Sequence, residues 1–230
     1  LADKGKQLLL FSFSDADHVV NALDAVGQYR VDGLVLASST IGQEQLLRMR
    51  RPGPRVVAFN QPAAVGLLPV VSVDNEAGTS LLAEHVAALG VRTATFVGGI
   101  ATASTDQVRY RGAAKALADR GIACPYIEAG GFTYDAGYKI AARFVDDRTL
   151  PDVVMVGSDE VAFGVIDGLT SAGFDVPGDV LVTGFDGLTQ ASWAGYDLTT
   201  LVQPVERLVD TAITMLFDPD GTPEATQIVP

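Results

Sequence analysis

The chain has 230 residues, 48% of them hydrophobic, and a formal net charge of −12 from 28 acidic and 16 basic residues. No apolar run approaches the roughly 18 residues that span a bilayer, and so acidic a surface repels the phosphate backbone of nucleic acids. The single cysteine, Cys124, excludes an intramolecular disulfide and a thiol-rich metal site and fits a reducing cytoplasm. We therefore expect a soluble chain that does not bind DNA or membranes by itself.

Short apolar runs recur along the chain and predict β-strands. Most are apolar at consecutive positions, which is typical of strands buried on both faces, as in a parallel sheet covered by helices. The predicted strands are Gln7–Phe13, Gly33–Ala37, Arg55–Asn60, Val70–Val73, Thr93–Val97, Tyr126–Ala129, Asp152–Val156 and Val180–Phe185.

Amphipathic stretches lie between these runs and predict helices. They are Ala16–Tyr29, Ala77–Leu89, Val108–Arg120, Ala136–Val145, Asp159–Ala172 and Pro204–Phe217. Gly90, Gly121 and Gly173 stand where glycine ends a helix. The alternation predicts an α/β fold with doubly wound parallel sheets. Its looser symmetry predicts two similar lobes, with a ligand cleft between them at the carboxyl ends of the strands.

Six segments, in order along the chain, resemble the core of the lac-repressor/galactose-repressor family. They are VDGLVLASS, SVDNEAG, LGVRTATFVGG, VRYRGAAKALADRGI, GSDEVAFGVIDGLTSAGFDVPGDVLVTGFDG and LTTLVQPVERL. The combination of VPGDVLVTGFDG with LTTLVQPV is the most specific of these matches. The resemblance implies a type I periplasmic-binding-protein-like fold, in which three crossovers join the two lobes.

The resemblance also implies a division of the chain. It places residues 1–72 and 204–230 in an N-terminal lobe and residues 73–203 in a C-terminal lobe. Family members begin this core with a central strand and precede it with a helix–turn–helix headpiece. Neither has a counterpart in this sequence, so we expect the first strand of the N-terminal lobe and the DNA-binding headpiece to be absent from it.

Asp186 and Ser158 are predicted to bind ligand from the ends of two strands. Asp186 closes the strand VLVTGF, and its carboxylate is suited to hydrogen bonds from sugar hydroxyls or an amine. The alternative is a carboxylate that caps the next helix. Ser158 and Asp159 follow another strand; the family places ligand contact at the first, and we interpret Asp159 as the helix cap.

Gln107 occupies a position at which many sugar-responsive members of the family carry arginine. Its amide has no charge, which argues against a sugar acid or a phosphorylated effector. Arg109 and Arg111 are close by in sequence, although helical spacing need not point them the same way as Gln107.

Four further residues are candidates for contact with ligand. Phe132 stands where the family often stacks an aromatic ring on a sugar, with a core or lid phenylalanine as the alternative. Gln203 lies at an inferred crossover, where it donates either to ligand or to hinge backbone. Phe13 and Ser14 end the first predicted strand and are expected at the rim of the cleft.

Other residues are given structural roles. Trp193 falls on a surface that the family uses for dimerisation, and aromatic residues are enriched in interface cores; a stacking platform for ligand is the alternative. Asp74 and Asn75 lie at the first crossover and are assigned to the hinge.

Motifs of catalysis are absent from the sequence. It contains no G-x-G-x-x-G, phosphate-cradling or G-x-S-x-G pattern and no metal-binding histidine or cysteine cluster. We therefore expect no enzyme, no cofactor and no metal. The function predicted is the effector-sensing core of a homodimeric cytoplasmic transcription regulator. It binds a small molecule, a neutral sugar by family habit, and acts on operator DNA through the absent headpiece. A nucleoside effector and a periplasmic sugar-binding protein of an ABC transporter are the alternatives.

Overall fold

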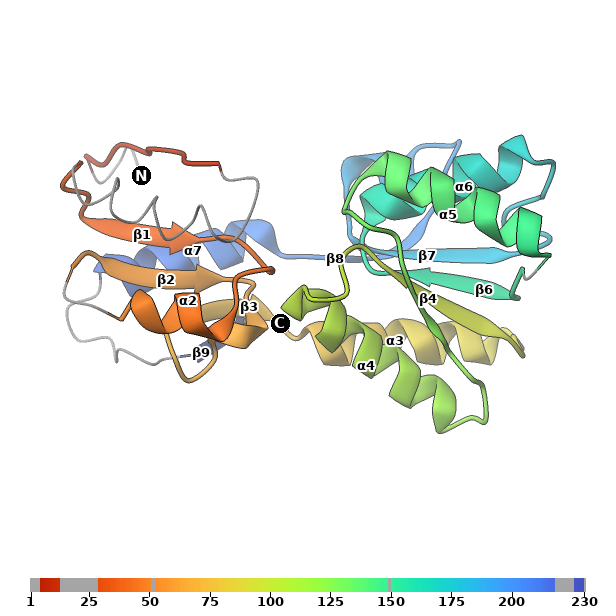
Figure 1. Ribbon diagram of the computed structural model, residues 1–230, viewed down its shortest axis with the longest axis horizontal. Coiled ribbons are helices and arrows are strands. Elements are labelled where there is room, and N and C mark those ends of the chain that lie inside the picture. The colour runs from red at the N-terminus through yellow and green to blue at the C-terminus, as the bar shows by residue number, and fades with distance from the viewer. Residues whose placement is uncertain (1–4, 13–28, 51–52, 149, 218–225, 230) are drawn as a thin grey trace.

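The computed structural model describes residues 5–12, 29–50, 53–148, 150–217 and 226–229. Two parallel sheets lie end to end, each with its own helices, and two crossing segments are visible between them (Figure 1). This is the predicted α/β fold with two parallel sheets. No helix among the described residues combines the length and apolar character that crossing a bilayer demands.

The first sheet has the strand order β1-β2-β3-β9. Its strands are β1 (Gly33–Leu36), β2 (Arg55–Phe59), β3 (Val70–Val73) and β9 (Thr226–Val229). The short helices α2 (Gln43–Arg48) and η2 (Pro62–Ala64) contact each other beside this sheet. Helix α7 (Val205–Phe217) packs on it, and the apolar side of α7 buries Leu208 against Val57 and Val71.

The second sheet has the order β5-β4-β6-β7-β8. Its strands are β4 (Ala94–Gly98), β5 (Tyr126–Glu128), β6 (Val153–Val156), β7 (Leu181–Asp186) and β8 (Thr199–Val202). Its helices are α3 (Asn75–Ala88), α4 (Ser104–Ala118), α5 (Tyr134–Asp147), α6 (Asp159–Ser171) and the short η3 (Thr189–Ser192). The α3–α4 pair and the α5–α6 pair pack into separate apolar clusters. Figure 1 shows the two pairs on opposite faces of the sheet, as a doubly wound lobe requires.

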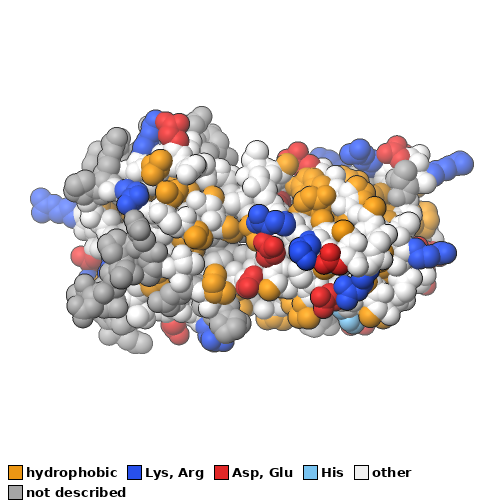
Figure 2. Space-filling model, turned by 90° about the horizontal axis from the view of Figure 1, so that it is seen from below, with side chains coloured by type: hydrophobic (Ala, Val, Ile, Leu, Met, Phe, Trp, Pro, Cys, Tyr) orange, Lys and Arg blue, Asp and Glu red, His pale blue; other side chains and the backbone are white. Residues whose placement is uncertain are grey.

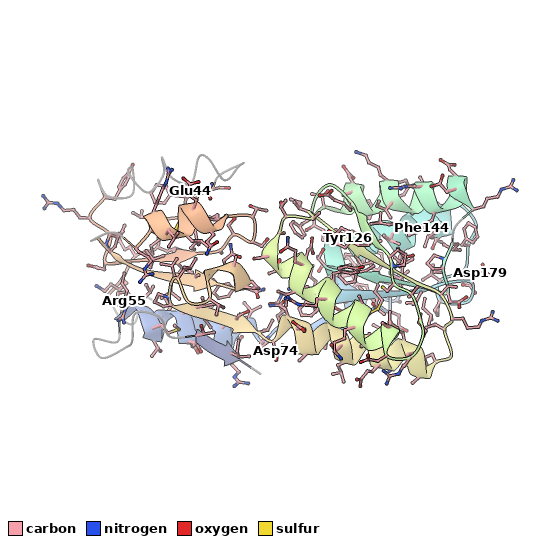
Figure 3. All side chains as sticks on the ribbon, turned by 60° about the horizontal axis from the view of Figure 1, so that its bottom comes forward. Glu44, Arg55, Asp74, Tyr126, Phe144 and Asp179 are labelled. Atoms are coloured by element: carbon pink, nitrogen blue, oxygen red, sulfur yellow. The ribbon has the colours of Figure 1, made fainter. Side chains whose placement is uncertain are left out.

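The chain passes between the sheets directly after β3 and directly after β8. Strand β3 belongs to the first sheet, and α3, which begins one residue after Asp74, packs on the second. In the other direction, β8 ends the second sheet at Val202 and α7 begins at Val205 on the first. Asp74 lies between the two lobes in Figure 3.

One predicted strand is not formed, and one strand of the structure was not predicted. Residues 7–12 form no strand, and Leu8, Leu9 and Leu10 are 74%, 52% and 86% exposed. In the described part of the chain β1 pairs only with β2, so this apolar run has no strand beside it. Strand β8 was not predicted, because this short edge strand is only partly buried and lacks a continuous apolar run. The predicted helix Ala16–Tyr29 lies almost wholly outside the described residues.

Charged side chains of both signs are interspersed on the face shown in Figure 2. Acidic and basic residues alternate over the middle of that face, and the basic ones form no continuous stripe. This distribution gives this face no basic surface of the kind that tracks a phosphate backbone.

Candidate functional site

Polar residues gather where the carboxyl ends of the strands from both sheets meet. Asn60 follows β2, Asn75 begins α3 directly after the first crossover, and Gln203 follows β8. Asp186 is the last residue of β7, and Arg109 reaches this point from the second turn of α4. We call these five residues the interlobe ring, because hydrogen bonds connect them in a closed circuit.

Arg109 is the centre of the interlobe ring. Its side chain is 5% exposed, and its Nε donates to Oδ1 of Asn75 at 2.8 Å. Nη1 donates to the carbonyl oxygen of Gly157 at 2.6 Å and lies 3.5 Å from Oδ1 of Asp186. The guanidinium carbon lies 3.7 Å from the centre of the Phe185 ring, which adds a cation–π contact. Three polar partners and an aromatic face therefore fix the guanidinium plane.

The remaining bonds of the interlobe ring run through three amides. Asn75 Nδ2 donates to Asn60 Oδ1 at 2.9 Å, and Asn60 Nδ2 donates to Gln203 Oε1 at 3.2 Å. Gln203 Nε2 then donates to Oδ1 of Asp186 at 2.6 Å, and this oxygen also faces Arg109. Each amide uses both its donor and its acceptor, so the circuit is satisfied throughout. Arg109 and Asp186 are thus connected by hydrogen bonds to a residue at each crossover.

Two residues of the interlobe ring have unusual backbone angles. Asn60 has φ 47° and Asp186 has φ 136°. Non-glycine residues with positive φ are uncommon, and such strain concentrates at binding sites. Asn60 is held by a second hydrogen bond, from Ser72 Oγ to its Oδ1 at 3.0 Å. The strain at both positions therefore adds to the evidence that this junction is functional.

Burial governs the charges at this junction. Burial raises the pKa of Asp186, while Arg109 and the hydrogen bond from Gln203 oppose the rise. Burial lowers the pKa of Arg109, and the Asp186 carboxylate opposes that change. Each group thus supports the charged form of the other. Nη2 of Arg109 makes no hydrogen bond to the described residues, so it is a donor available to a ligand.

Two buried polar atoms beside the interlobe ring lack a partner among the described residues. They are Oδ1 of Asp106 and Oγ of Ser158. Oδ2 of Asp106 accepts the backbone N–H of Ile100 at 2.9 Å, and burial raises the pKa of this carboxyl group. A Cβ atom on Gly157 would lie 2.8 Å from Oδ1 of Asp106, so Gly157 leaves the room that this carboxylate occupies.

The structure brings Asp186 and Gln203 together and places Ser158 nearby. Ser158 follows Gly157, whose carbonyl oxygen binds Arg109, and it occupies the capping position of α6 without a capping side-chain bond. The interpretation of Asp159 as the cap is wrong. Asp159 is the first residue of the helix, fully buried, and its two oxygens accept hydrogen bonds from Thr200 Oγ1 and the backbone N–H of Leu188.

Other predicted site residues lie apart from the Arg109–Asp186 pair. Gln107 is exposed, and its amide donates to the carbonyl oxygen of Ala101 at 3.1 Å. Phe132 is half-buried over Gly99, where a Cβ atom would lie 2.4 Å from its ring. Phe13 and Ser14 lie outside the described residues. The contacts of Gln107 and Phe132 are thus with the loop after β4 rather than with the interlobe ring.

The residues with predicted structural roles are also placed. Asp74 caps α3, because its Oδ1 accepts the backbone N–H of Ala77 at 2.9 Å. Asn75 is buried and belongs to the interlobe ring, so its role reaches beyond hinge geometry. Trp193 follows η3 and is 55% exposed.

Sequence reasoning missed Arg109 and Asn60 as members of the site. A signal for Arg109 was present, because it shares the buried side of α4 with Gly112, Ala113 and Ala116. An arginine on an apolar helical stripe needs a buried partner. The predicted site residue Gln107 precedes Arg109 by two positions and therefore lies on another side of α4. Asn60 carried no comparable signal, since asparagine after a strand is ordinary turn chemistry.

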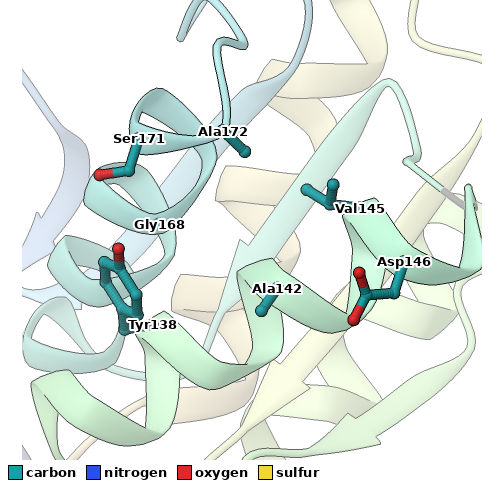
Figure 4. A pocket seen from close by; sticks show the side chains of 7 residues that line it. All are labelled: Tyr138, Ala142, Val145, Asp146, Gly168, Ser171 and Ala172. Atoms are coloured by element: carbon teal, nitrogen blue, oxygen red, sulfur yellow. The ribbon is translucent and has the colours of Figure 1, made fainter.

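Two surface hollows lie elsewhere on the second lobe. The first, between α5 and α6, is lined by Tyr138, Ala142, Val145, Asp146, Gly168, Ser171 and Ala172 (Figure 4). The second lies beside α3 and β8, around Leu81, His85 and Leu201. Neither includes a residue of the interlobe ring. No group of three or more His, Cys, Asp or Glu side chains among the described residues is arranged to hold a metal ion.

A family model described as "Periplasmic binding protein-like domain" matches residues 83–229. The chain belongs to this family. It is 32% identical over 221 residues to the HTH-type transcriptional repressor PurR of Serratia proteamaculans (strain 568), an alignment that covers 94% of this chain and 64% of that protein. The chain therefore spans a little under two thirds of the length of this relative. The predicted resemblance to lac/gal-type regulators is confirmed.

Solved structures share the fold. A LacI family transcriptional regulator from Mycobacterium smegmatis superposes with a TM-score of 0.87 at 24% identity, over 99% of this chain and 85% of that one. A LacI family transcriptional regulator from Enterococcus faecium with bound ribose gives a TM-score of 0.80 at 24% identity, over 92% of this chain and 81% of that one. These periplasmic binding protein-like chains have the same two-sheet architecture.

Proposed function

We propose that this periplasmic binding protein-like chain is the effector-sensing core of a transcription regulator and that its effector binds at the Arg109–Asp186 pair. The observation that carries the proposal is the interlobe ring, in which an ion pair between buried Arg109 and half-buried Asp186 is hydrogen-bonded to residues at both crossovers. A ligand that engages Arg109 Nη2 and Asp186 acts on the residues that set the relative orientation of the lobes.

The proposed mechanism is a population shift between lobe orientations. A ligand biases this equilibrium only to the extent that it binds the two orientations with different affinity. Residues 1–72 and 204–230 form the N-terminal lobe in this proposal, and residues 73–203 form the C-terminal lobe. DNA binding belongs to a helix–turn–helix headpiece outside this sequence, as the name of the PurR relative, an HTH-type repressor, suggests.

We propose a neutral sugar as the effector. The protein in this proposal is cytoplasmic and has no enzymatic activity. The guanidinium supplies donors and the carboxylate supplies acceptors, which suits a polyhydroxy ligand. The structural neighbour from Enterococcus faecium has bound ribose, which supports the sugar class. Ser158, Phe132 and Gln107 are proposed as further ligand contacts, and Phe13 and Ser14 as rim residues. Asp74 and Asn75 are proposed as the hinge.

A thermal-shift panel tests this function. Neutral sugars including ribose, sugar acids, sugar phosphates and nucleosides are each added to the chain and unfolding is followed by fluorescence. A ligand at about 100 times its Kd adds about 2.7 kcal/mol, equivalent to roughly 5–10 °C for a chain of this size. A shift with a neutral sugar is expected, and a response to anionic members alone contradicts the proposal.

Paired carboxylate variants locate the binding site. Asp186→Asn is expected to abolish the ligand-induced shift. Asp167→Asn is the matched control, because Asp167 accepts hydrogen bonds from Tyr134 and Tyr196 within the second lobe and lies outside the interlobe ring. The control is expected to retain the shift. An unchanged response in Asp186→Asn removes Asp186 from the site.

Homodimerisation through Trp193 is part of the proposal. This side chain is 55% exposed, and one structural neighbour is a dimeric lac repressor. Light scattering is expected to give a dimer for the parent chain and a monomer for Trp193→Ser. Tyr29→Ser is the control, because Tyr29 is another aromatic residue, 60% exposed, on the other lobe. A monomeric parent chain contradicts this part of the proposal.

A further inference from the structure

A second contact between the lobes lies at the first turn of α4, apart from the crossovers. The backbone N–H of Ser104 donates to the carbonyl oxygen of Ser39, in the loop after β1, at 2.9 Å. Ser104 Oγ is hydrogen-bonded to Oε1 of Gln61, which follows β2. Ser39 and Gln61 follow strands of the first sheet, whereas α4 packs on the second. We call Ser39, Gln61 and Ser104 the α4 latch.

Helix α4 lacks a cap from its own side. The first N–H groups of a helix have no partner within the helix and are usually satisfied by a Ser, Thr, Asp or Asn side chain at the capping position. In α4 that position is Ala103, which has no such group. The Ser39 carbonyl of the other lobe instead accepts the N–H of Ser104, the first residue of the helix. Separation of the lobes therefore leaves the start of α4 uncapped.

The side chain of Gln61, which the first lobe contributes to the α4 latch, is held in place by hydrogen bonds within its own lobe. Gln61 is fully buried, and its Nε2 donates to the carbonyl oxygens of Ser38 at 2.6 Å and of Ile41 at 3.4 Å. These bonds orient Oε1 toward Ser104. On the other side, Ser104 is only 8% exposed although it begins a helix. Because both partners are buried and oriented, the contact is specific rather than incidental.

The same helix carries the centre of the interlobe ring. Arg109 follows Ser104 by five residues, about 7.5 Å along a helix that rises 1.5 Å per residue. A shift of the helix at Arg109 carries the first turn of α4 with it, because the helix is continuous from Ser104 to Ala118. Figure 1 shows α4 running from the junction along the second lobe.

We propose that the α4 latch holds the two lobes together in the ligand-free chain and that α4 connects it mechanically with Arg109. The latch is thus a built-in restraint on lobe orientation, distinct from the crossovers. Its role in the effector response rests on the proposed function, but the latch itself is measurable without any ligand. Failure of the effector assay therefore leaves this test intact.

Amide hydrogen exchange at residue 104, followed by NMR on the ligand-free chain, tests the latch. Ser104→Ala removes the hydroxyl's bonds to Gln61 and to the carbonyl oxygen of Ser39 at 3.3 Å, and it keeps the backbone amide that reports on opening. Exchange of that amide, corrected for intrinsic chemistry, is expected to accelerate about tenfold. The internal reference is the amide of Ala129, which donates to Gly98 within the second lobe at 2.8 Å, and its exchange is expected not to change.

A matched serine separates the latch from general loosening of α4. Ser80 Oγ contacts the carbonyl oxygen of Gly112 in α4 at 3.1 Å, entirely within the second lobe. Ser80→Ala is expected to leave exchange at residue 104 unchanged. The latch is refuted if Ser104→Ala leaves the rate unaltered, if it accelerates the Ala129 amide equally, or if Ser80→Ala has the same effect.

The connection through α4 needs a separate variant. Arg109→Lys keeps the positive charge but loses the planar contacts to Asn75 and Gly157. The amide at residue 104 is expected to exchange at least about threefold faster in this variant, with the Ala129 amide unchanged. An unaltered rate at residue 104 overturns the connection and leaves the latch itself in place. Equal acceleration of both amides shows general destabilisation and also overturns it.

Discussion

Asn75 Oδ1 accepts a hydrogen bond from Arg109 Nε at 2.8 Å, and this bond joins the first crossover to the buried cation of the second lobe. Asn75 is the first residue of α3 and lies two residues after β3 of the first sheet. Its amide nitrogen turns the other way, to Asn60 of the first lobe. One side chain therefore touches both lobes at the point where the chain passes between them.

The first prediction concerns this bond. Asn75→Ala leaves the buried Nε of Arg109 without its acceptor, and an unsatisfied buried group costs about 1–3 kcal/mol, at the upper end for a charged one. Urea unfolding is expected to show a lower free energy of unfolding by that amount. Asn75→Ala also removes the bonds that its Nδ2 makes to Asn60, Ser72 and Val73. Gln107→Ala is the comparison, because it truncates an amide on α4 that is exposed and makes a single hydrogen bond, to the carbonyl oxygen of Ala101. Its expected effect is below about 0.5 kcal/mol. Equal losses in both variants contradict the central role of Asn75.

The second prediction uses the buried carboxyl group of Asp106, whose pKa burial raises above its ordinary value. Above the unfolded pKa of about 4, the folded chain holds this proton more tightly than the unfolded chain. The contribution of Asp106 to stability therefore falls as pH rises through the window up to its folded pKa. Asp106→Asn cannot ionise and still offers an acceptor to Ile100. Its stability relative to the parent is expected to rise with pH.

The control for this pH dependence has the opposite sign. Hydrogen bonds from the backbone of Arg92 and Thr93 lower the pKa of Asp152. The contribution of Asp152 to folding stability is fully present above its unfolded-state pKa of about 4, and it is lost as pH falls through the pKa of Asp152 in the folded chain. Asp152→Asn is expected to lose stability relative to the parent as pH rises from about 3 to 5. Urea midpoints of all three chains across acid to neutral pH measure both slopes; parallel slopes would refute the assignment.

Sequence periodicity predicted most of the architecture, and the reasons for its failures are physical. Strands such as Val153–Val156 are buried on both faces and contain only apolar residues, so their pattern is unmistakable. The edge strand β8 is short and partly exposed, so it lacks the continuous apolar run by which the buried strands were recognised. Helix α4 begins four residues before the predicted start, because its polar first turn is buried by the other lobe and not by a local pattern.

The candidate site was predictable only in part. Asp186 was found because it closes a predicted strand, and Gln203 because the resemblance placed it at an inferred crossover between the lobes. The pairing of Arg109 with Asp186 joins residues 77 positions apart, and the contact of Asn60 with Gln203 joins residues 143 apart. Neither contact can be recognised from the local hydrophobic pattern of the sequence. Such contacts depend on how the two sheets meet, which a single sequence does not encode in any short window.

A third prediction concerns the thiol of Cys124. The side chain is 8% exposed, and burial raises its pKa to about 12. Only the thiolate reacts with aromatic disulfides, so labelling of the folded chain at mildly alkaline pH is expected to be slow. Labelling in urea is expected to be fast and stoichiometric, which serves as the control. Rapid reaction of the folded chain would show that this part of the second lobe opens readily.

The last prediction concerns the close approach of α5 and α6. A Cβ atom on Gly137 would lie 2.0 Å from the carbonyl oxygen of Val161, and one on Gly164 would lie 2.0 Å from that of Tyr134. Real Cβ atoms do not approach backbone so closely, so Gly137→Ala must push the helices apart. The expected loss exceeds the roughly 1–3 kcal/mol of ordinary overpacking.

Gly131→Ala provides the comparison for that loss. A Cβ atom there meets only Thr133 and Ala136, at ordinary contact distances of 3.9 and 4.0 Å. The two variants add the same methyl group. Because Ala is favoured over Gly inside a helix, a lower urea midpoint for Gly137→Ala than for Gly131→Ala comes from the helix contact. Gly131→Ala is expected within about 0.5 kcal/mol of the parent. If both variants match the parent, α5 and α6 separate without cost, and their close approach does not contribute to the stability of the second lobe.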